Sequence, residues 1–219
     1  MAGLTSWNSG EDFASLGIGH FIWYPKNARG PFEESFPKLV DYISAHGGKL
    51  PDILLSRGSC PWNSRAEFIA ASQTPVMKQL RQFLGDTVAL QAEFLVNRLQ
   101  EALPKMLGEI DEVGRAQIQK QFERVANTPS GCYALVDYVN FKGEGVLATE
   151  RYAGQGWGLL QVLEGMSGES QDHATVASFA ASAKKVLANR VRNSPPARNE
   201  ARWLPGWVNR INTYTKDGL

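Results

Sequence analysis

The segment Ser15–Tyr24 constrains the fold more than any other part of the chain. Its residues read Ser-Leu-Gly-Ile-Gly-His-Phe-Ile-Trp-Tyr, so two glycines flank a β-branched residue and lead into an aromatic-rich run. Glycine within a strand pattern marks a tight turn or a place where another segment lies against the backbone. The pattern therefore predicts a β-hairpin near 15–24. We expect His20, which follows the glycines, to be structural, with its ring hydrogen-bonded to a nearby carboxylate or carbonyl.

From residue 33 onward, apolar residues recur at helical spacing. Ser64 and Glu67 have the spacing of a capping box, which predicts a helix start at residue 64. The predicted helices cover 36–46, 64 onward, 86–107, 111–126, 132–141, 157–166, 172–192 and 198–214, the last interrupted at Pro205-Gly206. The fold class expected is mainly α (α+β), with a small N-terminal β-hairpin element packed on a helical body. We expect a single domain, 1–219, with a small β lobe at 1–31 and a helical lobe at 32–219.

The composition is that of a soluble globular protein, with 219 residues, 43% hydrophobic and 21% charged. No run approaches the ~20 apolar residues of a membrane span. Two cysteines and three scattered histidines have no metal-ligand spacing, so neither a metal nor a cofactor is expected. The abrupt start at Met1 favours a trimmed N-terminus. We expect a periplasmic or extracellular location if a leader was removed, and otherwise a cytoplasmic one.

The net charge is +1, so nucleic acid is not the expected partner. Basic residues are concentrated between Lys184 and Lys216, where Glu200 is the one acidic residue. This segment either faces an anionic partner, such as a cell-wall polymer or nucleic acid, or forms a solvated helix face.

Two further stretches carry candidate binding residues. Asn140 lies near the Gly143 end of the apolar helix predicted at 132–141, as a ligand contact or as a buried polar group of the core. The stretch Gly154–Val162 has three glycines in five residues, which permit close approach by a ligand or by another chain segment. Trp157 has a flat face suited to stacking on a sugar ring, and Gln155 and Gln161 can bind hydroxyl or acetamido groups. Alternatively, this stretch is a helix-packing turn with a core tryptophan.

These segments resemble glycan-cleaving proteins of the lysozyme-like superfamily. Gly17–His20 resembles the Gly-Ile-Gly-His segment of phage-type lysozymes, whose small sheet lines the sugar cleft. The helix ending at Gly143 is similar to their Phe-Asn-x-Gly helix, with the order of Asn140 and Phe141 reversed. Gly158–Gln161 is similar to the Gly-Leu-Met-Gln motif of lytic transglycosylases, and Ala201–Arg210 to the C-terminal helix of phage lysozymes. The resemblance implies a divergent member that cleaves peptidoglycan or a related β-linked amino-sugar polymer through a carboxylic general acid.

The resemblance also indicates which residues act. In phage-type lysozymes the acid lies upstream of the sheet, at a position that falls just before Met1, and Ser15 occupies the place of their threonine. Glu144 matches the transglycosylase acid, although the Glu-Ser pair of that family is replaced by Glu144-Gly145. Glu11, beside Asp12, is a substitute acid or part of a solvated turn, and Glu150 is a third candidate beside Arg151.

The predicted site therefore has Glu144 and Glu11 as catalytic residues. Its predicted substrate-binding residues are Ser15, Asn140, Gln155 and Trp157. We expect the β element around Ser15 and the turn at Gly154–Trp157 to face each other across a groove that binds the polysaccharide. Two alternatives are open: a non-catalytic glycan-binding or structural protein with this fold, and a helical protein with no connection to glycans.

Overall fold

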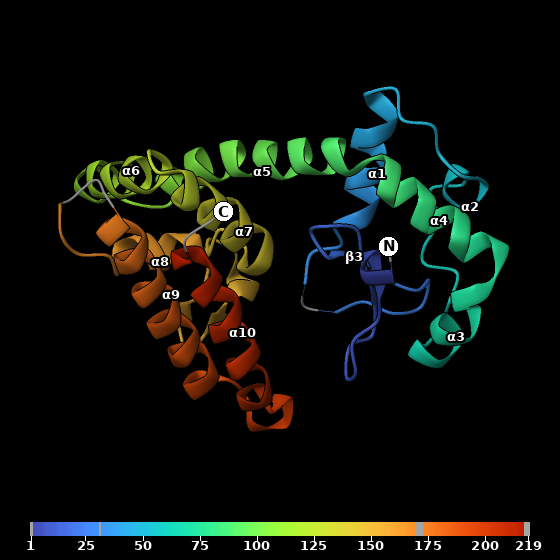
Figure 1. The fold of residues 1–219 in the computed structure, drawn as a ribbon. Helices are drawn as coiled ribbons and strands as arrows, with labels where there is room; N and C mark the ends of the chain where they lie inside the picture. Colours follow the sequence, from blue (N-terminus) through green and yellow to red (C-terminus); the bar gives the residue numbers. More distant parts are fainter. Residues whose placement is uncertain (1, 31, 170–172, 217–219) are drawn as a thin grey trace. The chain divides into compact units, whose positions relative to one another are not determined.

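The computed structural model describes residues 2–30, 32–169 and 173–216 (Figure 1). The chain divides into two compact units, Met1–Val96 (unit 1) and Asn97–Leu219 (unit 2). The division falls inside helix α5 (Val88–Gly108), which belongs to both units. The expectation of one lysozyme-like domain stays a prediction. The mainly helical class with a small antiparallel sheet near the N-terminus is confirmed.

The sheet of unit 1 is antiparallel and has the order β1-β2-β3. Its strands are β1 (Thr5–Ser6), β2 (Ala14–Leu16) and β3 (Phe21–Trp23). Leu16 pairs with Phe21 and Ser15 with Ile22, so the hairpin predicted at 15–24 is present. The additional strand β1 pairs Ser6 with Ser15.

The glycines between β2 and β3 allow a close approach to helix α5. Gly17 has a φ of +72°, and a Cβ there would lie 2.4 Å from Oε1 of Gln91. That oxygen accepts a hydrogen bond from the Ile18 amide at 3.0 Å, and Nε2 of the buried Gln91 donates to the Leu84 carbonyl at 2.7 Å. The turn residue His20 is exposed and has a φ of 52°. The hydrogen bond expected of its ring stays a prediction.

The helices of unit 1 pack around an aromatic-rich core. They are α1 (Phe36–Ala45), α2 (Asp52–Leu55), α3 (Arg65–Ala70), α4 (Pro75–Asp86) and the first part of α5. As predicted, α3 begins after Ser64, whose Oγ accepts a hydrogen bond from the Glu67 amide at 3.2 Å. The Glu67 carboxylate accepts from the Asn63 amide at 2.8 Å, one residue earlier than in a standard capping box.

In unit 2 the described residues form helices and the β4–β5 hairpin. Its elements are α6 (Glu112–Ala126), α7 (Pro129–Lys142), β4 (Arg151–Tyr152), β5 (Gln155–Gly156), α8 (Leu159–Glu164), α9 (His173–Asn193) and α10 (Leu204–Ile211). Helix α7 begins earlier than predicted because Thr128 caps it and Pro129 occupies its first position. The predicted start of the next long helix, residue 172, lies outside the described residues.

Short 3₁₀ helices connect several of these elements, and they explain the break near the C-terminus. They are Ala2–Leu4, Ala71–Gln73, Ala148–Glu150, Pro196–Arg198, Glu200–Trp203 and Asn212–Thr215. The break in the helix was expected at Pro205-Gly206, but α10 begins at Leu204, one residue before Pro205. Proline does not interrupt the helix there because it is tolerated in the first turn.

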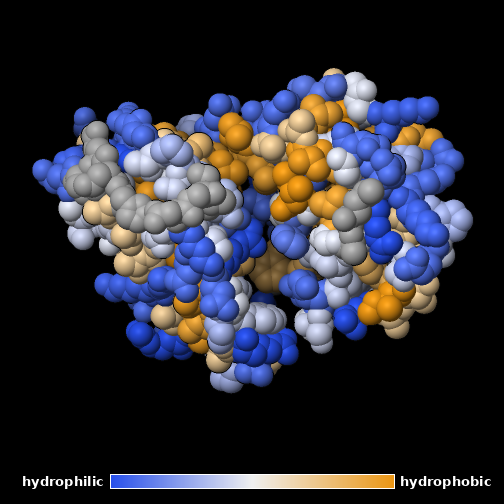
Figure 2. Space-filling model, in the orientation of Figure 1, coloured by the Kyte–Doolittle hydropathy of each residue, from blue (hydrophilic) through white to orange (hydrophobic). Residues whose placement is uncertain are grey.

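The visible face of the protein is mixed in polarity. On the face that Figure 2 shows, hydrophilic residues dominate and hydrophobic residues form smaller groups between them. Among the described helices, none combines the length and apolar character needed to cross a membrane.

A buried ionic cluster joins three segments of unit 2. The Glu200 carboxylate accepts hydrogen bonds from Nε and Nη2 of Arg190 at 2.7 and 2.9 Å, and from Nε of Arg198 and the hydroxyl of Tyr152 at 2.9 Å each. The side chains of Arg190 and Glu200 are 2% and 0% exposed. Burial by itself raises the pKa of the Glu200 carboxyl, but the hydrogen bonds and charge of Arg190 outweigh it and lower the pKa below its ordinary value. The cluster ties the β4–β5 hairpin to α9 and to the chain that precedes α10.

A second polar cluster ties the C-terminal segment to α7. The guanidinium of Arg210 donates to both oxygens of Asp137, at 2.8 and 2.6 Å, and the Tyr214 hydroxyl donates to Asp137 at 2.6 Å. Burial works to lower the pKa of Arg210, but the Asp137 carboxylate outweighs it and raises the pKa.

The substitution Glu200→Gln should lower the free energy of unfolding by about 3–5 kcal/mol, because it leaves the buried Arg190 without its counter-charge. Urea unfolding followed by circular dichroism measures the change. The control Glu169→Gln removes an exposed carboxylate opposite Lys120 and should leave the unfolding midpoint in place. A loss below about 1 kcal/mol for Glu200→Gln would contradict the stabilising role of the cluster.

Candidate functional site

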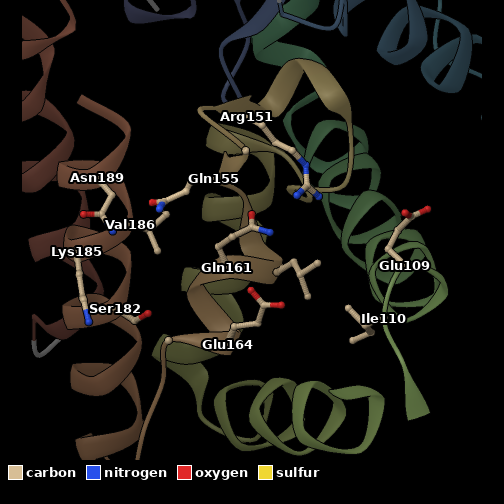
Figure 3. A pocket seen from close by; sticks show the side chains of 14 residues that line it. Glu109, Ile110, Arg151, Gln155, Gln161, Glu164, Ser182, Lys185, Val186 and Asn189 are labelled. Atoms are coloured by element: carbon tan, nitrogen blue, oxygen red, sulfur yellow. The ribbon is translucent and has the colours of Figure 1, made fainter. Parts of the chain in front are cut away.

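A pocket of about 530 Å³ lies within unit 2 (Figure 3). Four segments form its walls: the residues that follow α5, the β4–β5 hairpin, helix α8 and helix α9. Its polar lining residues are Glu109, Arg151, Gln155, Gln161, Glu164, Ser182, Lys185 and Asn189. The volume is in the range of about 300–1,000 Å³ that is usual for small-ligand sites.

The β4–β5 hairpin forms one wall of the pocket through a tight two-residue turn. Tyr152 pairs with Gln155, and the two residues between them, Ala153 and Gly154, have φ values of 49° and 76°. Positive φ at both positions is the requirement of a type I′ turn, which suits the twist of two-residue hairpins. Ala153 is an uncommon residue for this conformation, and it indicates that the hairpin holds the turn against local preference.

The glycines of this region allow two segments of the backbone to pack closely against each other. A Cβ on Gly158 would lie 2.0 Å from the amide nitrogen of Gly145, so the two backbones touch. The Gln161 amide spans the contact, since its Oε1 accepts from the Gly158 amide at 3.0 Å and its Nε2 donates to the Gly145 carbonyl at 3.2 Å. The amides of Leu159 and Leu160 donate to the carbonyls of residues 143 and 144. Gln161 therefore positions α8 and has little capacity left for a ligand.

Glu164 is the pocket carboxyl with a perturbed environment. Glu164 is an exposed residue of α8, and partial burial of its carboxyl raises the pKa above its ordinary value, while the positive charge of Arg151 opposes this shift in part. The carboxylate points into the pocket (Figure 3). Glu164 lies three residues after Gln161, on the same face of α8. A carboxyl that holds its proton more firmly than usual is suited to general acid catalysis.

Several other side chains of the pocket have hydrogen-bond donors or acceptors that no other group of the described residues occupies. Among the described residues, the side chains of Glu109, Lys185 and Asn189 have no hydrogen-bond or ion-pair partner, and Arg151 makes one bond, to the Gly145 carbonyl at 3.1 Å. Ser182, by contrast, donates its hydroxyl to the Val162 carbonyl at 2.7 Å. A ligand would thus meet two cations, two carboxylates and the amides of Gln155 and Asn189.

Of the residues predicted to bind substrate, Gln155 lines this pocket. Trp157 follows it in the chain but is only 5% exposed. Its ring is covered by Tyr152, with centroids 4.5 Å apart, and by the Arg190 guanidinium at 4.1 Å. In this arrangement Trp157 packs against Tyr152 of the hairpin. Its sugar-stacking role stays a prediction.

The two predicted acids lie in different units. Glu144 belongs to unit 2, where its side chain is 13% exposed and its carboxylate is 3.5 Å from Nζ of Lys105. Glu11 belongs to unit 1 and accepts a hydrogen bond from Nδ2 of Asn8 at 2.9 Å. Neither is among the residues that line the pocket. Their catalytic roles stay predictions.

The remaining predicted contacts are also engaged within the fold. Ser15 is buried in β2 of unit 1, and its carbonyl accepts from the Ser6 hydroxyl at 3.2 Å. Asn140 of unit 2 accepts a hydrogen bond from Nη1 of Arg98 at 3.0 Å. The groove expected between the Ser15 element and the Gly154–Trp157 turn would join the two units, and it stays a prediction.

Glu150, the third candidate acid, is hydrogen-bonded within the fold, and its catalytic role stays a prediction. Its Oε2 accepts hydrogen bonds from the amides of Gly145 and Leu147, at 2.8 and 3.2 Å. Burial raises its pKa, these amide hydrogen bonds oppose the shift, and the charge of Glu144 adds to it. Through these hydrogen bonds, Glu150 fixes the conformation of the loop around Gly145, which packs on Gly158.

Sequence reasoning missed Glu109, Glu164, Lys185 and Asn189. A signal for the last two exists, because Ser182, Lys185 and Asn189 recur at the spacing of one helix face. Among the residues that the structure describes, no three His, Cys, Asp or Glu side chains are grouped so as to hold a metal ion.

The substitution Gly158→Ala should destabilise the protein by more than about 2 kcal/mol, because its Cβ would overlap the Gly145 backbone and neither segment can turn aside. Gly206→Ala is the matched control: a Cβ there meets nothing within 4 Å and α10 gains a better helix former, so stability should rise by about 0.5–1 kcal/mol. Thermal unfolding compares the two variants. Equal effects would show that the backbone contact does not limit the packing of α8.

The raised pKa of Glu150 predicts a pH dependence. The folded state holds this proton more firmly than the unfolded state, so the carboxyl's contribution to stability is complete at low pH and declines as the pH rises through its folded pKa. Glu150→Gln should remove this decline, so the variant should gain stability relative to the parent as the pH rises above about 4. Urea unfolding over that range measures the difference, with Glu112→Gln on the exposed start of α6 as control. A difference that is independent of pH would contradict this assignment.

Comparison with known proteins finds no family model, no curated protein and no solved structure that matches the chain. The resemblance of short segments to phage-type lysozymes and lytic transglycosylases stays an expectation. What the chain does is therefore inferred from its residues and their geometry.

Proposed function

We propose that the protein is a glycan-cleaving enzyme that acts on peptidoglycan or a related β-linked amino-sugar polymer through a carboxylic general acid. One observation carries the proposal: a carboxyl with a raised pKa, Glu164, points into a pocket lined by amide and cationic side chains. Cleavage of a glycosidic bond needs a carboxyl that is protonated at the working pH and can donate to the leaving oxygen.

The other lining residues are suited to an amino-sugar polymer. The amides of Gln155 and Asn189 can pair with hydroxyl or acetamido groups, each of which has both donor and acceptor atoms. Glu109 is a second, exposed carboxylate on the pocket wall. In this proposal Glu164 is the general acid, and Glu144 and Glu11 are the competing candidates from the sequence.

A second candidate function is glycan binding without cleavage. Its support is that both acids predicted from the sequence are engaged within the fold, Glu144 with Lys105 and Glu11 with Asn8. The pocket would then bind a glycan through its amides and charges, and Glu164 would serve recognition alone.

The experiment measures release of new reducing ends from purified, insoluble peptidoglycan. Glu164→Gln should lower the rate by about 10²–10⁴-fold, the contribution usual for a general acid, with little change in the unfolding midpoint. Glu101→Gln, an exposed carboxylate on α5, is the control and should retain full activity.

The outcomes separate the candidates. Loss of activity in Glu144→Gln or Glu11→Gln, but not in Glu164→Gln, would place the acid where the sequence predicts it. Co-sedimentation with peptidoglycan without any new reducing ends would support the binding function. Neither cleavage nor co-sedimentation would overturn both candidates.

A further inference from the structure

We propose that the pocket of unit 2 binds a ligand segment that has both a carboxylate and an ammonium group, as a short peptide with two free termini does. This inference rests on the proposed function, because the peptides attached to peptidoglycan strands carry such groups. It names the part of the substrate that the pocket recognises.

The first step is the balance of charge in the pocket. Arg151 and Lys185 contribute two positive groups and Glu109 contributes a negative group, while Glu164 holds the proton of the general acid, so the lining offers charges of both signs. A polyanion would meet repulsion from Glu109, and a polycation from the two cations. A ligand that contains both signs is the one that complements the lining.

The second step is that these four groups are not paired with one another. Among the described residues, no ion pair joins either carboxylate to Arg151 or Lys185. A carboxylate and an ammonium supply the missing partners through charge-assisted hydrogen bonds.

The third step is the placement of the amides. Asn189 lies one turn after Lys185 on α9, and Gln155 projects from the hairpin on the same side of the pocket (Figure 3). Both are able to donate to and accept from a peptide group. Lys185 and Asn189 thus form one wall for a carboxylate and its neighbouring peptide bond, and Glu109 lies on another wall for the ammonium.

The test uses the soluble dipeptide alanyl-alanine and its doubly capped form, N-acetyl-alanyl-alanine amide, in isothermal titration calorimetry with the full chain. The free dipeptide should bind at least about tenfold more tightly than the capped one, which has lost both charges. Lys185→Gln and Glu109→Gln should each weaken binding of the free dipeptide by about tenfold and leave binding of the capped form unchanged.

Lys184→Gln is the matched control, since it removes the adjacent lysine of α9 that does not line the pocket. It should leave the affinity unchanged. Equal affinity for the free and capped dipeptides would overturn the inference, as would equal weakening by Lys184→Gln and Lys185→Gln.

A second measurement separates this inference from the proposed function. Cleavage of glycan strands with their peptides attached is compared with cleavage of strands from which the peptides have been removed. Equal cleavage, without charge-dependent dipeptide binding, would overturn only the inference. Charge-dependent dipeptide binding without cleavage of either strand would support the inference and overturn the proposed enzyme.

Discussion

The pocket of unit 2 depends on a buried carboxylate, Glu200. Burying a charge is costly unless it is paired and fully hydrogen-bonded, and here Arg190, Arg198 and Tyr152 supply the partners. These partners come from different segments, so satisfying one carboxylate fixes the hairpin against α9. The same hairpin and helix carry Gln155 and Lys185. The hairpin and α9, which form two walls of the pocket, are thus held together by the ionic cluster, while Lys185, which lines the pocket, has no ion-pair partner among the described residues.

Much of the helical structure of this chain is predictable because short stretches of sequence are sufficient to indicate it. Apolar periodicity and capping residues placed α1, α5 and α6 to within two residues, and Ser64 marked the start of α3. The single turn α2 and the helix α4 escaped prediction, although Thr74 and Pro75 have the cap and first-position pattern that begins α4. The division of the chain into two units was not predictable from composition, because it falls inside α5, where no proline- or glycine-rich linker marks it.

The candidate site was predictable only in part, because its walls come from segments far apart in the sequence. The glycine-rich stretch identified Gln155, but a local sequence pattern does not show which side chains are exposed to a pocket and which are covered by other segments. Trp157 has the residue type of a sugar platform, and Arg190, more than thirty positions later, covers its ring. The tight backbone approach inferred from the glycines exists, and the partner is the Gly145 segment of the same chain. Glu164 was missed because nothing near it in the sequence signals that its carboxyl would be desolvated.

Two carboxyls of unit 2 have pKa values shifted in opposite directions, and this bears on the conditions under which the unit is most stable. The contribution of Glu200, whose pKa is lowered, is lost when the solution becomes strongly acidic. The contribution of Glu150, whose burial raises its pKa, declines as the pH rises through that raised pKa. The two carboxyls therefore respond to pH in opposite ways, so neither strong acid nor alkali leaves both contributions in place.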